Sequence, residues 1–101
     1  MTWFGMRVDA FSIVRGEEHL VRFASSDTGR RSFCSRCGTM MLFENPSRWP
    51  DEVHVTLASL EGALDRPPSV NTYWDHRARW ADDAHALPKR GGASGMETLD
   101  P

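Results

Sequence analysis

The chain has 101 residues, of which 40% are hydrophobic and 26% charged, values that fit one globular domain with a modest core. Its formal net charge of −2 excludes the strongly basic surface expected of a protein that binds nucleic acid or anionic lipid. The apolar runs are far too short for a membrane span, and the first residues lack the pattern of a signal peptide.

Extended runs separated by turn signals fill the first half of the chain. Each carries apolar or aromatic residues over a short stretch. The stretch 25–31, rich in Ser, Asp and Gly, predicts a turn before the last of these runs. The runs are residues 1–8, 9–18, 19–25 and 38–44.

Residues 52–60, "EVHVTLASL", give the clearest strand signal. Val53 and Val55 point to one side of an extended chain, while His54 and Thr56 point to the other. The alternation predicts a strand with one apolar face and one polar face, between two loops that contain prolines.

The second half of the chain is less regular. Residues 70–75 predict a last strand, and residues 76–88 have room for one helical turn. Residues 89–101 are polar, glycine-rich and aperiodic, which predicts a disordered tail. Many short strands with turns between them indicate an all-β domain of small antiparallel sheets over residues 1–88.

The only two cysteines, Cys34 and Cys37, lie in the stretch "CSRCG". Two intervening residues let both sulfurs reach one tetrahedral zinc ion. Gly38 can adopt a positive φ, which lets the chain turn and aim backbone N–H groups at the thiolates. In a chain without a secretion signal, such thiols are expected to be reduced and metal-binding, so we predict a cytoplasmic protein with a structural zinc.

Other interpretations of the pair remain open. A redox disulfide is less favoured, because the residues after Cys37 predict a strand and not the helix N-terminus typical of such motifs. The thiols are alternatively small apolar side chains with no chemical role. Among the four histidines, only His54 sits on a strand that could carry it close to a cysteine, and its simplest interpretation is still a surface residue.

A family resemblance rests on these residues together. The stretch "FCSRCGTMMLFEN", the strand "VTLASL", and Arg77 with Trp80 in "HRARW" resemble the glutathione-dependent formaldehyde-activating enzyme family, to which centromere protein V is also similar. The upstream residues resemble the family's middle segment, so the likeness covers residues 2 to about 88. The resemblance implies a β-tent fold supported by zinc, carbon–sulfur lyase chemistry and a glutathione adduct as the bound partner.

The family's remaining zinc ligands bear on activity. The resemblance implies that a Cys-x-Cys pair shares a structural zinc with Cys34 and Cys37, and that a Cys-x-Cys-x-x-Cys group holds a catalytic zinc. Both groups would precede Met1 in the family. Three explanations are open for these cysteine groups: they lie upstream of Met1, equivalent ligands come from a second chain, or the groups are lost. No catalytic residue is therefore assigned in this chain. A second copy of the chain would supply two more thiolates and form a zinc-bridged homodimer.

Two functions follow as hypotheses. The first is an enzyme of the carbon–sulfur lyase type, for which we expect no catalysis by this chain alone. The second is a non-catalytic, zinc-supported β module that binds a protein partner through exposed aromatic residues. The residues available for such a surface are Trp3, Trp49, Trp74 and Trp80, although a small domain needs most of its tryptophans in the core.

Overall fold

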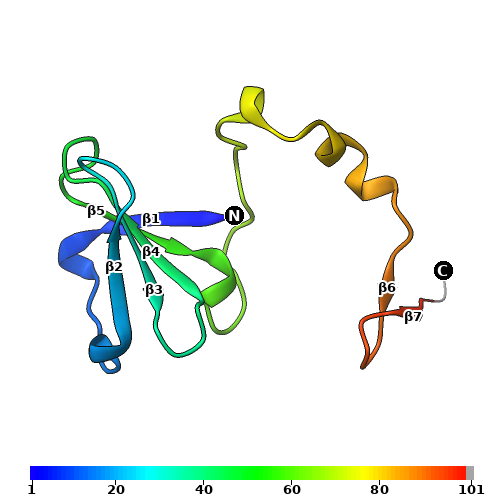
Figure 1. Ribbon diagram of the computed structural model, residues 1–101, viewed down its shortest axis with the longest axis horizontal. Coiled ribbons are helices and arrows are strands. Elements are labelled where there is room, and N and C mark those ends of the chain that lie inside the picture. Colours follow the sequence, from blue (N-terminus) through cyan, green and yellow to red (C-terminus); the bar gives the residue numbers. More distant parts are fainter. Residues whose placement is uncertain (100–101) are drawn as a thin grey trace. The chain divides into compact units, whose positions relative to one another are not determined.

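The computed structural model describes residues 1–99, and its main element is an antiparallel sheet of five strands (Figure 1). The strand order across the sheet is β1-β5-β4-β3-β2, so β1 and β2 form its two edges. The mostly-β architecture predicted from the sequence is confirmed at this level. The strands are β1 (Trp3–Arg7), β2 (Leu20–Ala24), β3 (Arg30–Cys34), β4 (Met40–Glu44) and β5 (Glu52–Thr56).

The alternation predicted for residues 52–60 holds within β5, which ends at Thr56 and continues as a 3-10 turn over Leu57–Ser59. Val53 and Val55 lie on one face of the sheet, opposite Met6 and Phe4 of β1. Buried apolar positions spaced two residues apart fix the register, because a slip by one residue would turn them to the other face.

A β-bulge interrupts the pairing of β3 with β4. Ser32 pairs with Leu42 and Phe33 pairs with Met40, which leaves Met41 as an extra residue. In a bulge two residues of one strand oppose one residue of the other, so their side chains no longer strictly alternate. Met41 and Leu42 accordingly both line the same cleft, described below.

The core of the sheet is small. Leu42 is 5% exposed and Val53 is 1% exposed, and these are the buried hydrophobic residues of the described chain. Aromatic packing supplements them on the opposite face of the sheet, where Phe43 lies among Trp3, Trp49 and His54. We call this the aromatic face, and we call the face that carries Leu42 and Val55 the cleft face.

The structure corrects the sequence prediction at three places. Residues 9–18, expected to be an extended run, contain no strand, and 3-10 turns occur at Val8–Ala10 and Glu17–His19. Residues 30 and 31, assigned to a turn, begin β3, because Arg30 and Arg31 pair with Glu44 and Phe43 of β4. Residues 70–75, expected to form a last strand, contain no strand, and Trp74–His76 forms a 3-10 turn instead. Tyr73 precedes this turn with a φ of 54°, a left-handed conformation that breaks extended structure.

The chain divides into two compact units, Met1–Pro68 and Ser69–Pro101. The second unit contains the 3-10 helix η5 (Arg79–Ala86), where the sequence predicted one helical turn. It also contains a hairpin of β6 (Arg90–Gly91) and β7 (Glu97–Thr98), within the range assigned to a disordered tail. The domain boundary predicted at residue 88 stays a prediction. The last two residues of the predicted tail, 100 and 101, lie outside the described residues. No described helix has the length and apolar content needed to cross a membrane.

Candidate metal site and adjoining cleft

The cysteine pair lies in the turn between β3 and β4, which we call the knuckle (residues 34–39). The Cys34 N–H donates to the Thr39 carbonyl at 2.9 Å, and the Gly38 N–H donates to the Cys34 carbonyl at 2.7 Å. Gly38 has a φ of +76°, which confirms the positive φ predicted for it. These two hydrogen bonds close the turn and hold both cysteines at one end of the sheet.

Both thiols are free, with Cys34 half-buried and Cys37 exposed. The Thr39 hydroxyl lies 3.1 Å from Cys37 Sγ. Hydrogen bonds from this hydroxyl, and then from the Thr39 N–H and the Cys34 thiol, lower the pKa of the Cys37 thiol, and the nearby Arg36 charge adds a smaller effect. Donors aimed at sulfur favour the thiolate, which is the form that binds metal.

The thiol pair matches half of the ligand set of a tetrahedral zinc site. The knuckle lets both cysteines line the same cleft, and it places the Thr39 hydroxyl 3.1 Å from Cys37 Sγ. Over residues 1–99, however, no three His, Cys, Asp or Glu side chains come together as a metal site. The residues described here therefore fit zinc as two of four ligands.

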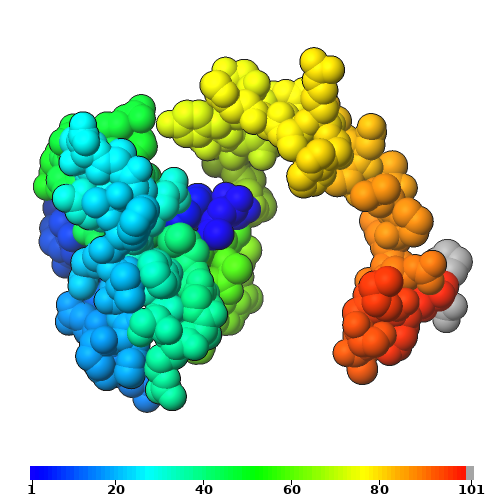
Figure 2. All heavy atoms as spheres, in the orientation of Figure 1, coloured from blue at the N-terminus to red at the C-terminus, as the bar shows by residue number. Residues whose placement is uncertain are grey.

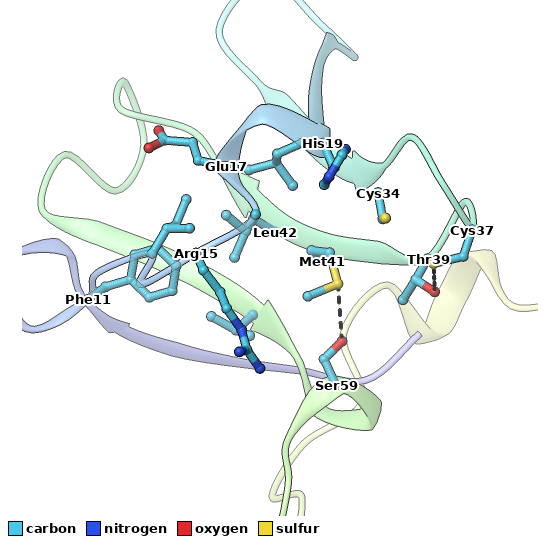
Figure 3. A pocket seen from close by; sticks show the side chains of 14 residues that line it. Phe11, Arg15, Glu17, His19, Cys34, Cys37, Thr39, Met41, Leu42 and Ser59 are labelled. Atoms are coloured by element: carbon cyan, nitrogen blue, oxygen red, sulfur yellow. Dashed lines mark hydrogen bonds between the residues drawn. The ribbon is translucent and has the colours of Figure 1, made fainter.

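His19 lies beside the knuckle, which the sequence did not indicate. Its carbonyl accepts a hydrogen bond from the Ser35 N–H at 2.7 Å, and its side chain lines the same cleft as both cysteines (Figure 3). The cause is the register of β2 with β3, in which Leu20 pairs with Cys34. Only the correct strand pairing could have revealed this neighbour. Figures 1 and 2 show the start of β2 and the knuckle side by side at the surface.

His54, by contrast, lies on the aromatic face and is not brought to the cysteines. Its ring centroid lies 5.0 Å from that of Trp49 and 6.0 Å from that of Phe43, and its Nε2 lies 3.0 Å from Glu52 Oε2. It is half-buried, so the simpler interpretation as a surface histidine does not describe it well. The structure thus leaves no in-chain role for His54 as a ligand beside Cys34.

A cleft of about 480 Å³ runs from the knuckle across the cleft face of the sheet (Figure 3). The connection between β1 and β2 forms one wall, and residues of β4 and β5 form the floor. Most lining side chains are apolar, with a few polar groups among them. The lining residues are Phe11, Ile13, Arg15, Gly16, Glu17, His19, Leu20, Cys34, Cys37, Thr39, Met41, Leu42, Val55 and Ser59.

Several polar groups of the cleft have partners within the protein. Ser59 Oγ lies 3.7 Å from Met41 Sδ and is hydrogen-bonded to the Thr56 hydroxyl. Glu17 accepts a contact from Arg22 at 3.2 Å. Volume, apolar walls and a small number of convergent polar groups are the properties of small-molecule sites in proteins.

Comparison with known proteins places the chain in a family. The model of the glutathione-dependent formaldehyde-activating enzyme family matches residues 1–76. A curated protein of Halomonas elongata, named as a glutathione-dependent formaldehyde-activating enzyme, is 30% identical over 76 residues, which cover 69% of this chain and 48% of that protein. The chain therefore spans about half the length of this relative. No solved structure matches the chain. The family resemblance seen in the sequence is confirmed: the chain belongs to the glutathione-dependent formaldehyde-activating enzyme family.

Proposed function

We propose that this chain supplies a structural half-site for zinc, formed by Cys34 and Cys37, within a protein of the carbon–sulfur lyase type that handles a glutathione–formaldehyde adduct. The observation that carries the zinc half-site is the knuckle, in which two free thiols line the same cleft and the Thr39 hydroxyl lies 3.1 Å from Cys37 Sγ. Family membership supports the adduct as substrate class. The β-tent arrangement of the family belongs to the same proposal.

Two further ligands are needed to complete a tetrahedral site. A second copy of the chain provides them with the right number and chemistry, through its own Cys34 and Cys37. An isologous dimer of this kind buries the metal between two knuckles, and the knuckle lies at the surface at one end of the sheet, where a partner can reach it (Figure 2). The proposed assembly is a homodimer with one zinc for two chains.

The zinc in this proposal stabilises structure, because four thiolates leave no open coordination position for a substrate. When bound, it ties the end of the β3–β4 hairpin to a partner and contributes directly to the free energy of folding. Cys34 and Cys37 hold it, and Thr39 orients Cys37 by donating to its sulfur. We accordingly expect this chain alone not to accelerate the formation of S-hydroxymethylglutathione.

The test measures zinc per chain by elemental analysis and molar mass by light scattering, on protein purified without chelator. We expect one zinc per dimer, and we expect chelation or Cys34→Ser to give monomers that melt at a lower temperature, since a hydroxyl is a poor substitute for a thiolate. Ser35→Ala, in the same turn, and His54→Ala, on the opposite face, are controls that should keep the metal. Protein without zinc would refute the metal site, and one zinc per monomer would refute the bridged dimer.

The second candidate is a protein-interaction module, and the second unit of the chain favours it. Its described residues expose several large apolar side chains, with Trp80 at 77% and Tyr73 at 69%. Trp74 is also exposed, although the guanidinium carbon of Arg77 stacks 4.2 Å from its ring centroid. Turnover of S-hydroxymethylglutathione by the zinc-loaded dimer would favour the lyase over this candidate, whereas absence of turnover is expected of both.

A further inference from the structure

Arg15 is an arginine of the cleft lining whose charge has no partner among the described residues. Other arginines of the same unit are engaged. Arg7 pairs with Asp9 at 2.6 Å, Arg22 pairs with Glu17 at 3.2 Å, and Arg31 stacks on Phe43 with 4.8 Å between guanidinium carbon and ring centroid. In Figure 3 the guanidinium of Arg15 extends over the cleft in the direction of Ser59.

The surface beside Arg15 is apolar. Leu42 and Val55, which are direct cross-strand neighbours, form the floor, and Phe11 and Ile13 stand on the same connection as Arg15. Apolar walls lower the local dielectric constant, so an ion that reaches a guanidinium there interacts with it more strongly than in open water. Such walls also favour a ligand whose remaining surface is apolar.

The charges near Arg15 permit an anion. Glu17 lines the same cleft and would repel one, but its carboxylate is paired with Arg22 at 3.2 Å. His19 lies next to Glu18, with 3.5 Å between its Nε2 and the carboxylate. Arg15 is therefore the cation left available in the cleft, and a guanidinium binds a carboxylate through two parallel hydrogen bonds.

We propose that the cleft binds a small organic carboxylate, with its apolar body over Leu42 and Val55 and its carboxylate on Arg15. A cleft of about 480 Å³ accommodates a ligand of this size. The ligand class is a simple apolar monocarboxylate. The assignment does not depend on zinc at the knuckle or on turnover of a glutathione adduct.

The experiment titrates the full chain, in its purified metal state, with three probes and follows backbone amide signals by NMR. Hexanoate and hexan-1-ol share an apolar body and differ in the carboxylate, whereas S-hexylglutathione presents the same body on a peptide. We expect hexanoate to shift the amide signals of Ile13, Leu42 and Val55, and we expect Arg15→Gln to weaken that binding about tenfold. Arg79→Gln removes the same charge outside the cleft lining and serves as the control.

Each outcome of the titration either supports or overturns the proposal. Binding of hexanoate at these residues supports the proposal, and binding of S-hexylglutathione without hexanoate overturns it in favour of a peptide ligand. The proposal is overturned if hexan-1-ol binds as well as hexanoate, if Arg15→Gln leaves the affinity of the bound carboxylate unchanged, or if shifts occur only at Trp49 and His54. Absence of any shift up to the solubility limit of the probes also overturns it. Unchanged amide dispersion in Arg15→Gln shows that the variant is folded.

Discussion

The two faces of the five-stranded sheet differ in whether their polar and aromatic side chains have partners within the protein. On the aromatic face, Phe43 lies 6.2 Å from Trp3 and 6.2 Å from Trp49 between ring centroids, and Arg31 stacks on Phe43. His54 completes this group and bonds to Glu52. The side chains of this face find their partners within the protein.

On the cleft face Ser59 and Glu17 have partners, but two thiols and one guanidinium form no disulfide or ion pair among the described residues. Cys34 and Cys37 carry free thiols, and Arg15 has no carboxylate among the described residues. Groups whose interactions are satisfied internally contribute to the fold, whereas groups without partners are available to ligands. We therefore expect the aromatic face to carry stability and the cleft face to carry function, a division that substitutions can test.

The largest expected effect is on the aromatic face. Phe43→Ala removes the ring shared by Trp3, Trp49 and Arg31, and we expect a loss of about 3 kcal/mol in the free energy of unfolding. Phe23 is the matched control, because Phe23 and Phe43 both pair with Arg31, from the strands on either side of it. Unlike Phe43, Phe23 is 61% exposed. Phe23→Ala should change stability by less than about 0.5 kcal/mol. Urea unfolding of both variants in the same metal state measures the two losses in the free energy of unfolding. Equal losses would contradict the assignment of stability to the aromatic face.

A smaller effect is expected in the knuckle. Gly38→Ala places a Cβ on a residue with a φ of +76°, which costs about 1 kcal/mol of stability because the left-handed region is unfavourable for alanine. Space is not the cause, since a Cβ there meets no atom within 4 Å. Gly38→Asn is the matched control, because Asn tolerates this conformation better and should lose less. A loss from Asn as large as that from Ala would show that the backbone angle is not the reason.

The smallest effect concerns the reactivity of a single thiol. Thr39→Val removes the hydroxyl that lowers the pKa of Cys37, so that pKa should rise and less thiolate should exist at neutral pH. Alkylation of Cys37 by iodoacetamide in metal-free protein should then be slower, and its rate should rise at higher pH than in the wild type. Tryptic cleavage after Arg36 separates the two cysteines, so mass spectrometry follows each one alone.

Thr28→Val is the control for this experiment. Thr28 is exposed and outside the knuckle, so the substitution removes a hydroxyl without changing the donors to Cys37. An unchanged pH profile in Thr39→Val would show that Thr39 does not set the reactivity of Cys37.

The sequence predicted the features that depend on local pattern. The alternation around Val53 and the glycine after Cys37 are readable because a strand and a positive φ each have a signature within a few residues. No strand was predicted at β3, because Arg30 and Arg31 follow a strong turn signal and have no alternation of their own. They become a strand because β2 and β4 both pair with them.

The cleft was beyond prediction from pattern, since it is made by residues distant in sequence. His19 reaches the knuckle only through the pairing of Leu20 with Cys34, and His54 is kept from it by the side of the sheet on which it lies. Arg15 carries no motif at all. A register shifted by one residue would turn the side chains of a strand to the other face of the sheet and reverse these placements. The residues that meet in the cleft are therefore determined by tertiary structure.

The strand order also has a consequence for how the sheet assembles. Strands β2 to β5 follow one another as successive antiparallel neighbours, so their contacts are local in the sequence. β1 pairs with β5 and must wait for a long loop to close, which costs conformational entropy before any contact repays it. The knuckle belongs to the early part, within the hairpin of β3 and β4. We therefore expect both thiols to be positioned before the amino-terminal strand docks.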